Sequence, residues 1–189
     1  MKTTSTPLKT WLSTILWTLG LACVAAGAEG LDPAMQARID AKIKEAQAWA
    51  AEPAIVNAVK AHNANLPPEE AAMTQDKWKA LSILDPLVRS FTKNDAAAFL
   101  KTKKSEVVTE AFVSGADGLK VAFLAKTSGW SHKGKAKHDL PMSGKTWQGT
   151  PELDESTGLQ QIQVSVPVLD GDKPIGSLVI GMSLSRLSQ

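Results

Sequence analysis

The sequence predicts an α+β domain in which helices come first and a meandering antiparallel sheet of about five strands follows. Residues 32–103 are divided by Pro and Asn into short helical segments. After Lys103 and Lys104 the apolar residues fall into short β-branched and aromatic runs with turn residues between them. A chain of 189 residues is long enough for one domain and hardly for two.

The first 28 residues have the pattern of a signal peptide. Lys2 and Lys9 stand at the basic end, residues 11–24 form a short apolar run, and residues 26–28 read Ala-Gly-Ala, a small-x-small cleavage motif. We therefore expect residues 1–28 to be removed, which leaves one mature domain that is exported to the periplasm.

Two alternatives stay open for this segment, namely an uncleaved membrane anchor and lipid attachment at Cys23. The apolar run is short for a span, which needs about 20 residues, and Gly20 stands where a lipid-attachment signal has Leu. Cleavage removes two lysines and the only cysteine, so the net charge falls from +2 to 0. The mature domain, residues 29–189, then has no thiol for a disulfide, a metal or catalysis, and no charge excess that favours nucleic acid.

The first helix is predicted to begin at Asp32, a helix N-cap followed by Pro at the first helical position. Its apolar residues occupy about a third of the helical circle: Met35, Ile39, Ile43, Ala46, Trp49 and Ala50. This stripe favours a long helix lying along a sheet over a dimerising coiled coil, because it covers barely two heptads. Pro53 ends the helix, and shorter helical segments continue to about residue 103.

Two hairpins are predicted in residues 107–187. Residues 114–118 form the turn of the first, and residues 170–172, Asp-Gly-Asp, form the turn of the second. Pro167 marks an edge or a bulge, because proline removes a ladder hydrogen bond. A fifth strand is expected near residues 145–149.

Three segments resemble the single Cache, or PDC-type, extracellular sensor domains: EPAIVNAVKAHNAN, VTEAFVSGADGLKVAFLAKTSGW and QVSVPVLDGDKPIGSLVIGMSLSRL. The resemblance covers most of residues 32–187. It implies a PAS-like fold, with the long helix and a helical connector packed on a five-stranded antiparallel sheet. It also implies a small-molecule pocket on the opposite face, roofed by residues 128–156 and floored by polar strand residues.

The resemblance further implies signalling. Many such domains are the outer part of a membrane receptor, whereas this sequence reaches Gln189 without a second apolar span. We therefore expect a membrane-bound signalling partner. A cluster of lysines in the connection favours an anionic ligand of the carboxylate or amino acid class, although a solvated flexible loop is an equal alternative: Lys126, Lys133, Lys135, Lys137 and Lys145.

Eight residues are the candidate ligand contacts: Trp130, His132, Lys145, Trp147, Asp154, Gln161, Gln163 and Ser165. The two tryptophans are expected either to stack on a ligand or to pack in the core or a lid. The polar strip at residues 161, 163 and 165 alternates with apolar residues and suits orienting hydrogen bonds. Asp154 is placed at the pocket edge by the resemblance, where it could receive a ligand amine.

No catalytic, metal or cofactor site is predicted. His132 and His138 are interpreted as solvated loop histidines, because too few ligands accompany them for a metal. Ser131, His132 and Asp139 lack the strand–turn–helix context of a serine hydrolase. The alternative to a sensor is a structural or interaction module that kept the fold and filled the pocket, with Phe123, Leu124 or Met142 as the filling side chain.

Overall fold

The computed structural model describes Met1, residues 31–153 and residues 160–189. The remainder of the predicted signal peptide and the candidate Asp154 lie outside the described residues. Residues from Leu31 to Gln189 form one compact unit. Within the described part of the chain, no helix combines the length and apolar character that a membrane crossing requires.

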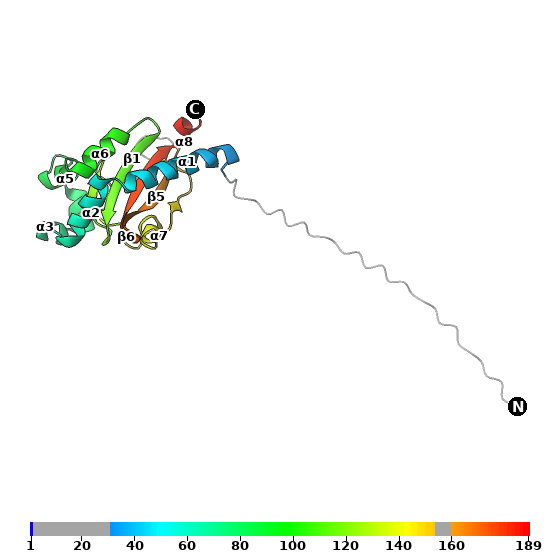
Figure 1. Ribbon diagram of the computed structural model, residues 1–189, viewed down its shortest axis with the longest axis horizontal. Coiled ribbons are helices and arrows are strands. Elements are labelled where there is room, and N and C mark those ends of the chain that lie inside the picture. Colours follow the sequence, from blue (N-terminus) through cyan, green and yellow to red (C-terminus); the bar gives the residue numbers. More distant parts are fainter. Residues whose placement is uncertain (2–30, 154–159) are drawn as a thin grey trace. The chain divides into compact units, whose positions relative to one another are not determined.

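The sheet is antiparallel throughout, as the sequence predicted (Figure 1). Five strands follow one another across it: β2 (Lys120–Phe123), β1 (Val108–Gly115), β6 (Lys173–Ser183), β5 (Gln160–Asp170) and β3 (Trp147–Gln148). A short sixth strand, β4 (Glu152–Leu153), also pairs with β5. The expected fifth strand near residues 145–149 is therefore β3.

The predicted helical segments are confirmed. They are α1 (Pro33–Ala50), α2 (Pro53–Ala64), α3 (Pro68–Ala71), α4 (Gln75–Ala80), α5 (Pro86–Ser90) and α6 (Asp95–Lys103), and two further helices follow, α7 (Ala136–Met142) and α8 (Leu184–Leu187). The side chain of Asp32 accepts a hydrogen bond from the amide of Ala34, and Asn94 caps α6 by accepting from the amide of Ala97 at 2.9 Å. Local capping thus sets where these helices begin.

The β5–β6 hairpin has the turn that the sequence indicated. Asp170 pairs with Lys173, and Gly171 takes a φ of +60°, which favours glycine. Pro167 pairs with Ser177 of β6, while β3 pairs only with Val164 and Ser165 of β5. Pro167 therefore lies past the end of β3, on an open edge of β5, where a missing amide donor is tolerated.

The first face of the sheet carries the main apolar core. Ile162, Val164 and Val166 of β5 are fully buried there together with Ile39 of α1 and Ile55 of α2. Figure 1 shows α1 and α2 crossing this side of the strands. Because strand side chains alternate between faces, the polar residues 161, 163 and 165 must point to the second face.

The second face is divided between an aromatic core and a polar region. The aromatic core comprises Trp78, Val88, Phe91, Phe112, Phe123, Trp130 and Val179. Its rings pack edge-on or tilted with centroids 4.9–6.1 Å apart, the geometry that aromatic pairs prefer. The polar region lies under α7, which packs against β3, β5 and β6.

Candidate functional site

The connection between β2 and β3, residues 124–146, covers the polar region of the second face. It carries α7, and the Nδ1 atom of His138 lies 2.9 Å from Ser177 Oγ, which joins this helix to β6. Strand register places Glu110 opposite Gly181, which is itself opposite Gln163. Side chains from β1 and β5 therefore meet over a glycine, where no side chain of β6 separates them.

A small cavity lies at this place. Its volume is about 120 Å³, and its lining residues are Lys137, Trp147, Gly149, Thr150, Glu152, Gln161 and Gln163. Three of the eight candidate contacts are among them. The volume is below the roughly 300–1,000 Å³ typical of pockets for drug-sized ligands, so the cavity suits a molecule of a few heavy atoms.

Two consecutive hydrogen bonds link Lys137 and Gln163 of the cavity lining to Glu110. Lys137 Nζ donates to Gln163 Oε1 at 2.6 Å, and Gln163 Nε2 donates to Glu110 Oε2 at 2.6 Å. Burial lowers the pKa of the Lys137 amine. Glu110 opposes this effect, repulsion from Lys135 adds to it, and Glu152 of the cavity lining opposes it least. A cation held in this way gains most from a negative charge placed beside it, so the cavity is suited chemically to an anion.

A buried lysine and histidine lie on Phe112, two residues from Glu110 on the same face of β1. Lys120 is fully buried, its Nζ contacts His132 Nδ1, and it lies 4.5 Å from the ring centroid of Phe112. The His132 ring stacks on Phe112 with centroids 4.7 Å apart. Burial lowers the pKa of Lys120 well below its usual value, with repulsion from Lys137 next in size, and burial together with Lys120 lowers the pKa of His132 to about 2.

The expectation of solvated loop histidines is wrong. His132 is 5% exposed and His138 is 2% exposed. Each is buried by a partner on a strand distant in sequence, Phe112 for His132 and Ser177 for His138. A connection rich in Gly and Lys indicates exposure locally, and the packing of the connection on the sheet, through His132 on Phe112 and through α7 on β5 and β6, reverses that.

The two tryptophan candidates have different places. Trp130 is 3% exposed and packs on Trp78 with centroids 4.9 Å apart, so it belongs to the aromatic core and not to the cavity lining. Trp147 is half-buried, pairs with Ser165 across β3 and β5, and forms a cavity wall. Gly149 leaves room for its ring, because a Cβ at that position would lie 2.8 Å from it.

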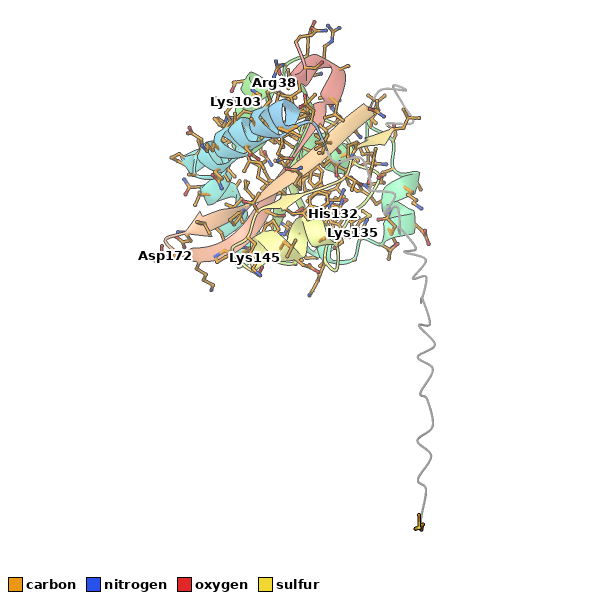
Figure 2. All side chains as sticks on the ribbon, turned by 90° about the vertical axis from the view of Figure 1, so that its right-hand side faces the viewer. Arg38, Lys103, His132, Lys135, Lys145 and Asp172 are labelled. Carbon is orange, nitrogen blue, oxygen red and sulfur yellow. The ribbon has the colours of Figure 1, made fainter. Side chains whose placement is uncertain are left out.

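The other candidates are spread over the face. Ser165 is fully buried, and its Oγ makes no hydrogen bond within the described residues. Lys145 is exposed and does not line the cavity. Figure 2 shows His132 and Lys135 close together, with Lys145 farther along the connection.

Sequence reasoning missed Lys120 and Glu110. Lys120 stands between Leu119 and Val121 in an apolar strand, which was a usable sign of an inward-pointing charge. Glu110 has no such sign, because β1 carries polar residues at both Thr109 and Glu110.

A larger cleft of about 520 Å³ lies at the other end of the helical connector, where α2, α3, α5 and α6 meet. Its buried His62 has Nε2 3.1 and 3.2 Å from the Asp117 carboxylate oxygens, and Nδ1 3.6 Å from Glu70 Oε2. Both ring nitrogens of His62 therefore face carboxylates. Its lining residues include no lysine or arginine, so the smaller cavity, which Lys137 lines, is the better candidate site for an anion.

No protein-family model and no curated protein sequence matches the chain. The ligand-binding domain of the Pseudomonas aeruginosa PAO1 amino acid chemoreceptor PctC, solved in complex with GABA, matches with a TM-score of 0.50 at 15% identity, over 82% of this chain and 57% of that one. The sensor domain of the V. cholerae histidine kinase DctB matches with a TM-score of 0.47 at 14% identity, over 82% and 54%. The E. coli DcuS sensor domain matches with a TM-score of 0.46 at 16% identity, over 84% of this chain and 97% of that one.

The chain spans little more than half of the PctC and DctB chains that it matches. The similarity to the PctC domain, at 15% sequence identity, shows a shared fold and nothing more. The chain has the α+β fold of the Cache, PDC-type sensor domains, with its long helix and helical connector on one face of the antiparallel sheet. The fold that the sequence resemblance implied is confirmed.

Proposed function

We propose that this protein is an exported sensor domain that binds a small carboxylate in the cavity under α7 and signals through a membrane-bound partner. The observation that carries the proposal is the position of Lys137. Its ammonium group lines a cavity of about 120 Å³, is held at 2.6 Å by Gln163, and is destabilised as a cation by burial. A ligand carboxylate in the cavity would add a negative charge beside this lysine and so offset the cost of burying its ammonium group further than Glu110 and Glu152 already do.

The other lining groups refine the ligand class. Trp147 supplies a flat apolar wall for a short carbon chain, and Gln161 and Gln163 supply amide groups that orient polar atoms. Glu152 lies on the cavity rim and could receive a ligand ammonium group. The ligand is thus a small carboxylate or amino acid, and GABA, present in the PctC structure, has both a carboxylate and an ammonium group.

A thermal-shift screen tests the site. Acetate, lactate, succinate, glycine and GABA are the probes, each added to the purified protein at a series of concentrations. Binding at one hundred times Kd stabilises by about 2.7 kcal/mol, which corresponds to a Tm rise of about 5–10 °C in a domain of this size. At least one probe is expected to give such a rise.

A pair of lysine variants distinguishes binding in the cavity from a general effect of positive charge on the protein surface. Lys137→Met keeps the length of the side chain and removes the cation, so it is expected to abolish the shift. Lys145→Met removes an exposed cation of the same connection that does not line the cavity, so the shift should persist. If no probe shifts the Tm, or if both variants respond as wild type does, the proposed cavity is not the binding site.

Export and signalling are separate parts of the proposal. Edman sequencing of protein recovered from the periplasm of an expressing bacterium should begin at residue 29. Cross-linking in those cells should join the domain to a membrane protein to an extent that depends on the active probe. A mature protein that starts at Met1 would contradict export by cleavage.

The alternative, a structural or interaction module without a ligand, has one observation in its favour. The aromatic core occupies part of the second face, with Phe123 fully buried and Trp130 nearly so. Phe123 was one of the filling side chains that the sequence suggested for this case. The alternative predicts no Tm shift with any probe, together with a Lys137→Met variant that is as stable as wild type or more so.

A further inference from the structure

We infer that the carboxylate is bound together with one proton, which is taken from solvent and held by the buried pair of Lys120 and His132. The inference rests on the proposed function and adds to it a specific regulation, namely that the affinity of the site depends on pH. It follows from the position of this pair on Phe112, which lies two residues from Glu110 on the same face of β1. Glu110 in turn is linked through Gln163 to Lys137.

The surroundings of Lys120 do not suit a permanent ammonium ion. Its side chain is fully buried, and its Nζ contacts His132 Nδ1 and the face of Phe112. Within the described residues, no carboxylate forms a salt bridge with it. The attraction to the Phe112 ring is smaller than the cost of desolvating an unpaired ammonium ion. A neutral amine that donates to His132 Nδ1 satisfies the same geometry without that cost.

The charged groups that act on the pair are mostly cationic. Glu110 from β1 is the acidic group among those that act on Lys120, whereas Lys135 and Lys137 on the connection repel its charge. His138 of α7 adds to the repulsion at His132. The cationic groups outnumber the one carboxylate, and Glu110 is already bonded to Gln163.

A bound carboxylate changes this balance by one unit of charge. It adds a third anion beside Lys137, after Glu110 and Glu152. This negative charge offsets the repulsion by which Lys137 disfavours a proton on Lys120. The step balances as site plus carboxylate anion plus one proton, giving a complex in which the Lys120 amine has become ammonium and remains bonded to His132 Nδ1. No bond other than that to hydrogen is formed or broken.

Two consequences can be measured. Proton uptake makes the affinity fall as pH rises, by up to about tenfold per pH unit where uptake is complete. It also adds the ionisation enthalpy of the buffer to the heat of binding, so the observed enthalpy differs between phosphate and Tris buffers at the same pH. The slope of observed enthalpy against buffer ionisation enthalpy is the number of protons taken up.

The experiment is isothermal titration calorimetry of the purified protein at pH 7.5 in phosphate, HEPES and Tris. The probes are acetate, lactate, succinate, glycine and GABA. Wild type is expected to take up about one proton per probe bound. Lys120→Met is expected to bind with no proton uptake, and the exposed-lysine control Lys145→Met should keep the wild-type slope.

The outcomes separate this inference from the proposed function. If none of the probes produces heat or a Tm shift, the proposed carboxylate site fails. If a probe binds to wild type with a slope of zero, the site stands and the proton inference is overturned. Uptake that persists in Lys120→Met also overturns it, since another group such as Lys137 would then hold the proton.

A second variant covers the case in which Lys120→Met does not fold. His132→Phe preserves a ring against Phe112 and removes the Nδ1 acceptor. Without this acceptor the ammonium form of Lys120 loses a stronger hydrogen bond than the neutral amine does, so a smaller fractional uptake than in wild type is expected. An unchanged uptake in His132→Phe would contradict the role of the pair.

Discussion

Lys137 Nζ lies 2.6 Å from Gln163 Oε1, and this contact joins α7 of the β2–β3 connection to β5, which follows β3 and β4 in the sequence. The contact has two roles. It positions the cation that lines the cavity, and it holds α7 on the sheet together with the hydrogen bond between His138 and Ser177. The stability of this region and the proposed binding are therefore coupled.

Replacing Gln163 with Leu is expected to lower the free energy of unfolding by about 1–3 kcal/mol. The substitution removes two hydrogen bonds and leaves Lys137 and Glu110 half-buried without the amide that links them. Urea denaturation followed by circular dichroism measures the change. Gln160→Leu, on the same strand but exposed, should stay within about 0.5 kcal/mol of wild type. Equal effects of the two substitutions would show that the chain through Gln163 does not stabilise the fold.

The two tryptophans should differ when each is truncated to alanine. Trp130 is buried in the aromatic core, where its ring contacts those of Trp78 and Phe91. Trp130→Ala is therefore expected to lower the free energy of unfolding by about 3–5 kcal/mol. Trp147 is half-buried on a two-residue strand, so Trp147→Ala is expected to cost less, while it weakens the response to an active probe. Urea denaturation and the probe Tm shift, measured on both variants, check this pattern. A larger loss of stability in Trp147→Ala would reverse the assignment of core and cavity wall.

The buried His132 should make stability depend on pH. Its pKa is about 2 in the folded protein, against an ordinary value of 6.5, because of burial and the neighbouring Lys120. The unfolded chain therefore binds more protons between these two values. Stability is fully present above pH 6.5 and is lost as the pH falls, by about 1.4 kcal/mol per pH unit for one group.

The variant His132→Phe removes this contribution while it keeps a ring against Phe112. Its free energy of unfolding should fall less steeply than that of wild type between pH 6.5 and pH 4. The comparison stops at about pH 4 because the carboxyl groups of Asp and Glu begin to titrate there. Urea denaturation at pH 4, 5, 6 and 7 supplies the comparison. Parallel profiles for the two proteins would mean that His132 titrates normally in the folded state.

Asp117 tests the link between the β1–β2 turn and α2. Burial raises the pKa of Asp117, but hydrogen bonds from His62 and from the amide of Leu119 outweigh it, so the net pKa is lowered. The stability from this carboxylate is present above its ordinary value of 3.8 and is lost as the pH falls through the lowered value.

Asp117→Asn is expected to cost about 1 kcal/mol at pH 7, because the side chain is about a third exposed and solvent screens the interaction. Asp172 is exposed in the turn between β5 and β6 and is labelled in Figure 2, so Asp172→Asn provides the control. Thermal unfolding of both variants gives the result. A neutral Asp117→Asn would indicate that His62 and Asp117 do not stabilise one another.

Much of the fold could be predicted because its signals are local. Asp32 with the following proline starts α1, and the alternation around Val164 sets which face of β5 is apolar. Gly171 permits the tight turn of the last hairpin. Each of these effects acts over a few residues, so it can be recognised without knowing which segments meet.

The candidate site was predicted less well, because burial of its polar groups depends on contacts between distant segments. The polar strip was placed on the correct face, and Gln161, Gln163 and Trp147 line one cavity. Trp130 instead joined the aromatic core, and Lys145 is exposed. Nothing in the connection itself distinguishes Lys137, which lines the cavity, from the exposed lysines beside it.

The sequence by itself determined the class of the fold, the starts of the main helices, the hairpin turns and the polar face of β5, since these follow from backbone preferences and side-chain period. Tertiary structure alone decided that Lys120 and His132 are buried against Phe112, and that Lys137 and Glu110 meet at Gln163. The physical reason is desolvation. Whether a charge is screened by water or held in a dry interior depends on what packs over it, and here that covering is the β2–β3 connection, with His132 over Lys120 and α7 over β5 and β6.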